Sequence, residues 1–163
     1  MGATTGLVSH YFPTKRALIA HARLVAEMRT ATMDRSVGHA PGYESLRAMI
    51  LEGLPLTSQK VALNRAWVSF WDAAIGDTEL HESETLRYEK WRTRIREHIV
   101  VAQTQRELLS SVLAADLSVM IASFAHGLVV QALFDTTRFT PKRQIQFVDQ
   151  FLATLIPHDN DSR

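Results

Sequence analysis

The first 15 residues of the chain carry side chains whose types and spacing suit contact with DNA. Gly2 permits a tight turn and Thr4 can cap a short helix, in which Val8 and Phe12 form a narrow apolar seam. Hydroxyl, imidazole and phenol groups suit contacts to phosphates and base edges. The other face of this helix shows Thr5, Leu7, Ser9, His10 and Tyr11. Thr14 and Lys15 then open a second helix, whose free amide groups and lysine can bind a phosphate.

A second group of residues is aromatic and lies in the middle of the chain. Trp67 and Trp71 are four residues apart and share one face of a helix. Aromatic walls with a few polar groups are typical of small-molecule pockets, and they can enclose a quaternary ammonium ion by cation–π attraction. Packing in an ordinary core is the alternative interpretation for each residue. The candidate pocket residues are Asn64, Trp67, Phe70, Trp71, Tyr88, Trp91, Met120 and Phe124.

Other chemistries lack the residues they need. The sequence has no cysteine, which excludes a disulfide scaffold, a thiolate zinc site and a cysteine nucleophile. His81 and Glu84 form a single reversed pair at a helix start, which we interpret as a solvated face and not as a metal site. No Gly-x-Ser-x-Gly elbow or phosphate-binding glycine loop occurs. We interpret His126 as a core or interface group, and we predict no enzyme activity, metal or cofactor.

The elements that must position these residues are helical. Apolar residues recur at helical spacing along most of the chain, and no strand alternation persists, so we predict an all-α bundle with short connections. Thr57 or Ser58 can cap one helix, and Thr140 before Pro141 caps the last. The predicted helices cover about 4–11, 15–35, 43–54, 58–75, 78–106, 108–134 and 141–156. The predicted organisation is a head with a linking helix (1–36), a helical domain (40–157) and a loose tail (158–163).

Composition and charge fit this organisation. The chain is 46% hydrophobic and 21% charged with a formal net charge of +1, which is typical of a globular protein and not of one that coats nucleic acid along its length. The first 26 residues carry basic side chains and no acid, which is compatible with DNA contact by one end only. The longest uncharged segment, 117–134, contains several polar residues, so we predict a helix buried on more than one side in a cytoplasmic protein, and no membrane span.

The opening segment resembles the helix-turn-helix signature of the TetR family of transcription regulators. The stretch Thr-Gly-Leu-Val-Ser-His-Tyr-Phe is especially similar to the choline-responsive betaine-repressor subgroup. The positions that fall on the family pattern are Gly2, Thr4, Gly6, Val8, Tyr11, Phe12, Thr14 and Lys15. The order of the remaining helices is also compatible with the family's ligand domain. The resemblance implies a ligand-responsive repressor that acts as a homodimer on a near-palindromic operator, with an unidentified small-molecule effector.

The resemblance also assigns roles to individual residues. Thr5 and Leu7 occupy positions that face bases in this family, and Val8 and Phe12 occupy positions that hold the reading helix on the head. The positions that touch phosphates or nearby base edges are Thr4, Ser9, His10, Tyr11 and Lys15. Ser9 stands where a tyrosine is commoner, so its contact is expected to be shorter or bridged by water.

Family members normally carry two further helices before this motif, about 35–45 residues by helix length. The sequence therefore predicts a truncated head, and we expect this form to bind operator DNA poorly because a lone recognition helix lacks the core that positions it. The alternative is a module that binds a small molecule or dimerises without any DNA role.

The last two predicted helices carry more apolar surface than packing on one side of each helix would bury. A helix that is apolar nearly all round must bury more than one side, and pairing with a symmetry mate would form a four-helix interface. A monomer with an unusually apolar helix is the alternative. The residues that we assign to the dimer interface are Leu117, Ile121, Leu128, Ala132, Phe147 and Phe151.

Overall fold

The computed structural model describes residues 40–157, and within this range the chain is helical without a single strand, which confirms the all-α prediction. Its helices are α3 (Tyr43–Gly53), α4 (Ser58–Gly76), α5 (Thr78–Thr104), α6 (Ala114–Phe134) and α7 (Pro141–Ala153). The predicted DNA-contacting residues, Thr4 to Lys15, lie outside the described residues, as do the whole predicted head (1–36) and the whole predicted tail (158–163).

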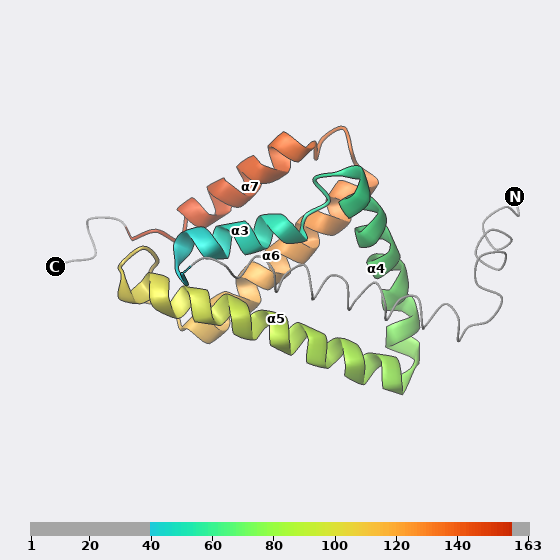
Figure 1. Cartoon of the computed structure of the whole chain (residues 1–163), viewed down its shortest axis with the longest axis horizontal. Coiled ribbons are helices and arrows are strands. Elements are labelled where there is room, and N and C mark those ends of the chain that lie inside the picture. The colour runs from blue at the N-terminus through green and yellow to red at the C-terminus, as the bar shows by residue number, and fades with distance from the viewer. Residues whose placement is uncertain (1–39, 158–163) are drawn as a thin grey trace, which may run out of the picture.

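The helix α6 lies at the centre of the bundle. It packs against α3, α4, α5 and α7. Figure 1 shows α7 and α3 side by side above the long α5, with α4 closing one end of the molecule and α6 crossing between them. Fully buried apolar side chains from four of these helices meet around α6, among them Ile50, Ile95, Ile121 and Val148. Burial of this kind contributes about 1.5–3 kcal/mol for each large side chain.

Among the described helices, α6 is the one that is long and apolar enough to cross a membrane, by length and composition. A core helix passes the same test, and α6 buries eight of its residues against its neighbours, including Leu117, Ile121, Leu128 and Ala132. The expectation that this segment is a helix with more than one covered side agrees with its contacts to four other helices.

Local capping sets where the helices begin. The side-chain oxygen of Thr57 accepts a hydrogen bond from the Lys60 amide at 3.2 Å, at the start of α4. Thr140 caps α7 in the same way, with Pro141 following it. These observations confirm the two caps expected from the sequence, since a hydroxyl at this position satisfies an amide that the helix leaves unpaired.

The connection between α5 and α6 differs from the prediction. The sequence predicts a helix over 108–134, but α6 begins only at Ala114. Arg106, with φ of 61°, follows the end of α5, and its amide donates to the Gln103 carbonyl at 3.1 Å while the next amide donates to Ala102 at 2.8 Å. This pattern is a Schellman turn, which stops a helix. The prediction was wrong here because the apolar residues after α5 lie in a loop and not in a helix: Leu108 is buried under this loop, whereas Leu113 is 72% exposed.

Polar side chains hold the loop before α6 and join α3 to α7. The Gln103 side-chain amide donates to the carbonyls of Leu109 at 2.6 Å and Val112 at 2.9 Å. Arg47 on α3 makes a two-pronged ion pair with Asp149 on α7, at 2.6 and 3.0 Å. Paired hydrogen bonds of this geometry join the two helices in one orientation.

Candidate functional site

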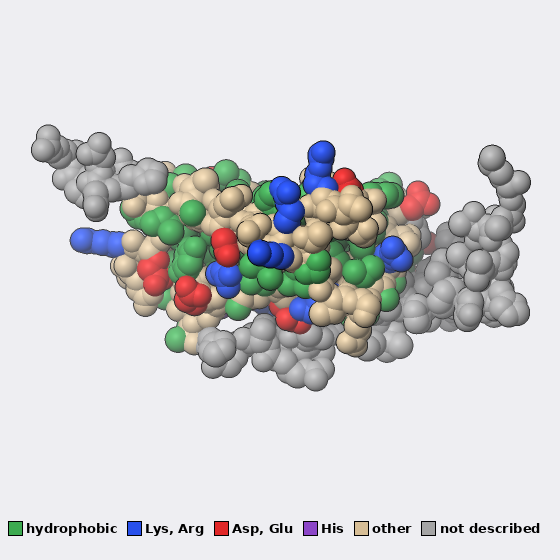
Figure 2. All heavy atoms as spheres, turned by 90° about the horizontal axis from the view of Figure 1, so that it is seen from above, with side chains coloured by type: hydrophobic (Ala, Val, Ile, Leu, Met, Phe, Trp, Pro, Cys, Tyr) green, Lys and Arg blue, Asp and Glu red, His purple; other side chains and the backbone are tan. Residues whose placement is uncertain are grey.

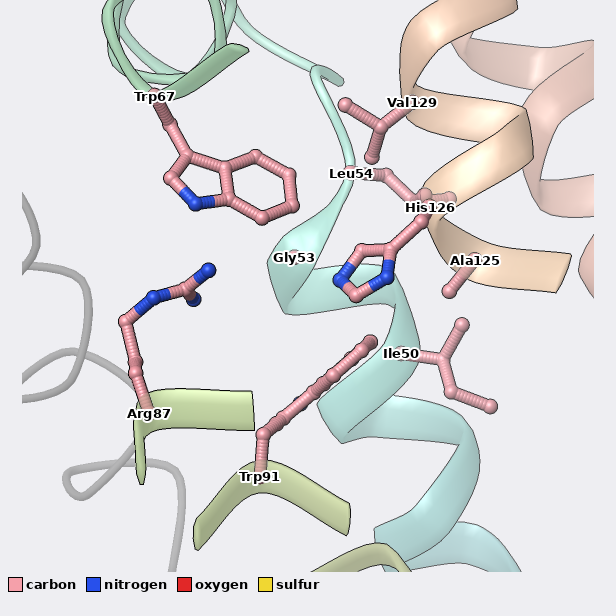
Figure 3. A pocket seen from close by; sticks show the side chains of 9 residues that line it. All are labelled: Ile50, Gly53, Leu54, Trp67, Arg87, Trp91, Ala125, His126 and Val129. Atoms are coloured by element: carbon pink, nitrogen blue, oxygen red, sulfur yellow. The ribbon is translucent and has the colours of Figure 1, made fainter. Parts of the chain in front are cut away.

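An aromatic cluster gathers where α4, α5 and α6 meet, and the imidazole of His126 lies at its centre. The centre of this ring lies 5.0 Å from that of Trp67, 5.0 Å from that of Tyr88 and 4.7 Å from that of Trp91. Trp71 is more distant, at 6.3 Å. Figure 3 shows His126 entering from α6 between Trp67 on α4 and Trp91 on α5. We call these five residues the aromatic cluster.

Helical spacing places the aromatic residues of each helix on the face that turns toward His126. Trp67 and Trp71, four residues apart on α4, meet edge to face with ring centres 4.8 Å apart. Tyr88 and Trp91, three residues apart on α5, both turn toward His126. The chain contains three tryptophans in total, and all of them belong to this cluster. Intrinsic tryptophan fluorescence therefore reports on this site alone.

A cation of the protein itself lies against the aromatic cluster. The guanidinium carbon of Arg87 lies 4.8 Å from the centre of the Trp67 ring and 4.7 Å from that of Tyr88. Figure 3 shows Arg87 reaching from α5 toward the face of Trp67. Both distances are within the range of about 6 Å over which a cation is attracted to an aromatic face.

Glu84 holds Arg87 in this position. The guanidinium donates from Nε to one carboxylate oxygen at 2.9 Å and from Nη2 to the other at 2.7 Å. The Glu84 and Arg87 side chains are only 9% and 18% exposed. The interpretation of Glu84 as part of a solvated face was therefore wrong: His81 is exposed, but Glu84 points into the bundle and is paired there.

The cavity inside the cluster is small. Its volume is about 20 Å³, and Trp67, Arg87, Trp91 and His126 line it together with apolar residues of α3 and α6. A cavity of this size holds about one water molecule. The protein's own side chains therefore fill the site, and any organic ligand would need at least one of them to move.

Two further groups define the polarity of the site. Burial raises the pKa of the Tyr88 phenol further above neutral pH, where the phenol is already uncharged at its ordinary value. The indole Nε1 of Trp91 is buried and has no hydrogen-bond acceptor among residues 40–157. A buried donor of this kind can serve a ligand oxygen.

The eight sequence-based pocket residues divide into three groups. Trp67, Trp71, Tyr88 and Trp91 come together in the aromatic cluster. Asn64 is buried on α4 and its side-chain amide donates to the Lys60 carbonyl at 2.8 Å. Phe70, Met120 and Phe124 do not line the cavity.

The misplacement of Met120 and Phe124 has a geometric cause. Residues on a helix turn by about 100° each, so Phe124 and His126 point to nearly opposite sides of α6. Phe124 instead stacks on Phe151 of α7, with ring centres 4.0 Å apart and planes at 10°. Met120 is 51% exposed. These two positions therefore require correction, because the pattern identified the helix but not the side that faces α4 and α5.

Arg87 and Glu84 were missing from the predicted pocket, and His126 had been interpreted as a core or interface group. On α5, Glu84 and Arg87 are three residues apart and fall on the same face as Tyr88 and Trp91. This clustering of an acid, a base and two aromatic residues within two helical turns is a signal that the sequence does contain.

The assigned dimer residues also require correction. Leu117, Ile121, Leu128 and Ala132 are at most 5% exposed and pack inside the chain's own core, so they offer no surface to a partner. Phe147 and Phe151 on α7 are half-buried. The exposed apolar side chains of α6 are different ones, namely Val119, Met120 and Phe134.

Outside the aromatic cluster, the described part of the chain has an open surface hollow of about 330 Å³ between α5 and α6, which no aromatic side chain lines. It is lined by Glu89, Arg92, Thr93, Arg96, Ala115, Ser118 and Val119. Figure 2 shows apolar side chains mixed with charges of both signs on the face that it presents, without a patch of one sign. Within residues 40–157, no group of three or more histidine, aspartate or glutamate side chains is placed to hold a metal ion. The aromatic cluster is therefore the candidate functional site.

Comparisons with known proteins agree with this fold. A family model described as the C-terminal domain of BetI-type transcriptional repressors matches residues 42–157. The HTH-type transcriptional regulator BetI of Escherichia coli K12 is 22% identical over 162 residues, which cover 97% of this chain and 80% of that protein.

Solved structures show the same architecture. A transcriptional regulator from Rhodococcus sp. Rha1 superposes with a TM-score of 0.75 at 18% identity, over 94% of this chain and 79% of that one. A transcriptional regulator from Saccharomonospora viridis, solved in complex with choline, gives a TM-score of 0.70 at 17% identity, over 97% and 83% of the two chains. At these identities the likeness establishes the fold.

The bundle is thus that of an all-α transcription regulator of the TetR type, as the opening motif indicated. Because the family model matches most of the chain, the protein belongs to the family of BetI-type transcriptional repressors through its C-terminal domain.

Proposed function

We propose that this chain is a ligand-responsive repressor whose helical domain senses a small organic cation in the aromatic cluster. The observation that carries the proposal is the gathering of Trp67, Tyr88, Trp91 and His126 around one point, with a positive charge already resting against two of their rings. Aromatic faces attract cations, and tryptophan does so most strongly.

Choline is the specific effector to test first. The Saccharomonospora viridis regulator of the same fold was solved with choline bound. A quaternary ammonium group suits aromatic walls, and the free Nε1–H of Trp91 can donate to an oxygen such as the choline hydroxyl. The proposal places the ammonium group against the cluster and the hydroxyl near Trp91.

The proposed regulator is a homodimer, with the outward side of α6 as its seam. Val119 and Met120 are about half exposed near the start of α6, and Phe134 is 85% exposed at its end. Exposed apolar surface of this kind can mark a protein–protein contact. A two-fold axis would place this side against its own copy, with α7 beside it. This seam replaces the buried residues that the sequence pattern suggested.

DNA contact is proposed for residues 1–36, with Thr5 and Leu7 reading bases and Lys15 binding a phosphate. Ligand binding can change DNA affinity only if the ligand prefers one arrangement of the two heads. Because α4, α5 and α6 all contribute to the aromatic cluster, a ligand there would bias the packing of three helices at once.

The test is binding of operator DNA, selected from genomic fragments, with and without choline, by the protein in a form that carries a complete DNA-binding head. The proposal expects choline to lower the affinity for the operator, and Lys15→Ala to weaken binding to all DNA and to reduce the dependence of log K on log salt by about one. Choline binding without any DNA binding at low salt would favour the alternative, a sensing or dimerisation module without a DNA role. DNA binding that no choline concentration changes would contradict the proposed effector.

A further inference from the structure

The aromatic cluster already contains a cation, and this cation belongs to the protein. Arg87 lies within 4.8 Å of the centres of the Trp67 and Tyr88 rings, which are two of the walls that an ammonium ligand would use. The remaining cavity, about 20 Å³, accommodates roughly one water molecule. A trimethylammonium group is much larger than a water molecule, so it cannot enter while Arg87 stays in this position.

The ion pair between Glu84 and Arg87 determines which kind of ligand can displace the Arg87 guanidinium from the rings. Glu84 is 7% exposed and its two carboxylate oxygens receive both hydrogen bonds from the Arg87 guanidinium. When the guanidinium leaves the rings, this carboxylate loses its partner inside the bundle, which is unfavourable unless a new positive charge arrives. A cationic ligand supplies that charge, whereas a neutral ligand of the same shape does not.

We propose that Arg87 is an internal competitor of the effector: the ligand binds by displacing the Arg87 guanidinium from Trp67 and Tyr88, and Glu84 then pairs with the ligand's positive charge. This inference rests on the proposed function, since it concerns the same site and the same class of ligand. It adds two properties. Arg87 lowers the affinity for the effector, and Glu84 gives the selectivity for a cation over a neutral analogue.

The opposite role for Arg87 makes the opposite prediction. If the guanidinium instead contacted the ligand directly, as it would with a carboxylate or another anion, its removal would weaken binding. The sign of the change in affinity when Arg87 is removed therefore separates a competitor from a contact.

The experiment is isothermal titration of the full chain with two probes, choline and its uncharged carbon analogue 3,3-dimethylbutan-1-ol. The variants are Arg87→Ala, the double variant Glu84→Gln with Arg87→Ala, and Lys90→Ala as the matched control. Lys90 is exposed on the same helix, so its replacement removes the same charge from α5 at the surface. The double variant leaves no unpaired carboxylate, so it remains informative if Arg87→Ala alone does not fold.

We expect Arg87→Ala to bind choline more tightly than the wild type by about 3- to 30-fold, the range of a cation–π contact that no longer has to be broken. Lys90→Ala should bind choline as the wild type does. The preference for choline over the neutral alcohol should be clear in the wild type and in Arg87→Ala. It should shrink toward equality in the double variant, which has lost the carboxylate.

Two results would overturn the inference, and they are distinguishable. If the wild type binds choline but Arg87→Ala binds it equally or more weakly, or if the double variant keeps the full preference for choline over the neutral alcohol, the inference is wrong, while the proposed effector stands. If neither the wild type nor any variant binds choline, the aromatic cluster does not take a quaternary ammonium ion. In that case the proposed effector and this inference are both wrong.

Discussion

The imidazole of His126 and the indole of Trp91 lie with their ring centres 4.7 Å apart and their planes at 37°, so that α6 and α5 meet through two aromatic side chains. Trp91 is 7% exposed and also lines the small cavity. This contact joins the core of the bundle to the candidate site, so a change in one is expected to affect the other.

Replacement of Trp91 by alanine should lower the free energy of unfolding by about 3–5 kcal/mol, because it removes a large buried ring and leaves a cavity. Trp91→Phe should cost less, since it keeps an aromatic ring against His126. Urea denaturation followed by circular dichroism measures both. Equal stability of Trp91→Ala and the wild type would show that this ring does not support the packing of α5 on α6.

The Glu84–Arg87 pair should behave as a buried ion pair. Arg87→Ala leaves the Glu84 carboxylate without its partner and should destabilise the fold by about 3–5 kcal/mol, whereas Glu84→Gln with Arg87→Ala should recover part of this loss. Asp135 and Arg138 form a comparable pair, three residues apart, with Arg138 73% exposed. Arg138→Ala should change stability by less than about 1 kcal/mol. Similar losses for the two arginines would contradict the burial of the first pair.

His98 should make stability depend on pH. Burial lowers its pKa below the ordinary value of 6.5 in the folded chain, and the nearby Glu97 opposes this only in part. The unfolded chain therefore takes up a proton near pH 6.5 that the folded chain does not, and the free energy of unfolding falls as the pH drops through 6.5 toward the lower, folded pKa. In His98→Gln this part of the pH dependence should be absent. Parallel stability curves for the two proteins between pH 7 and 5 would refute the assignment.

Replacement of Arg106 by glycine should stabilise the fold. Its φ of 61° lies in the left-handed region, which a residue with a side chain adopts at a cost and glycine adopts freely. Arg106→Gly should raise the free energy of unfolding by about 1 kcal/mol, because the Schellman turn after α5 favours glycine at this position. Thermal unfolding measures this gain. A loss of stability would mean that the Arg106 side chain makes a contribution larger than the backbone strain.

The outward side of α6 should control the oligomeric state. Met120→Asp places a charge in the proposed seam and should shift the protein from dimer to monomer in sedimentation velocity experiments. Val100→Asp is the matched control, because Val100 is 49% exposed on α5, outside the proposed seam, and the change should leave the dimer intact. A Met120→Asp protein that sediments as the wild type does would exclude this side of α6 as the interface.

Local features of the fold were predictable from the sequence because they depend on neighbouring residues. Thr57 and Thr140 cap helices as expected, since the partner amides lie only three positions away. The start of α6 was not predictable in this way. It depends on Gln103 reaching across the loop to the carbonyls of Leu109 and Val112, and apolar spacing alone continues the helix through this loop.

The candidate site was predictable in its residue types and less so in its geometry. The tryptophans at 67, 71 and 91 were identified because large aromatic residues at helical spacing are expected to pack against a core or a ligand. Met120 was misassigned, and His126 and Arg87 were missed, because the spacing identifies a face of a helix without saying which neighbour covers it. For the same reason, the sequence pattern assigned Leu117, Ile121, Leu128 and Ala132 to a dimer interface, although the chain's own helices cover them.

A crystal structure of the protein grown with choline would show most directly whether the aromatic cluster binds this cation. We expect the choline nitrogen within about 6 Å of the ring centres of Trp67 and Tyr88, with the Arg87 guanidinium moved off both rings. Choline bound elsewhere, or an unchanged Arg87 at 4.8 Å from Trp67 in a crystal saturated with the ligand, would contradict this expectation.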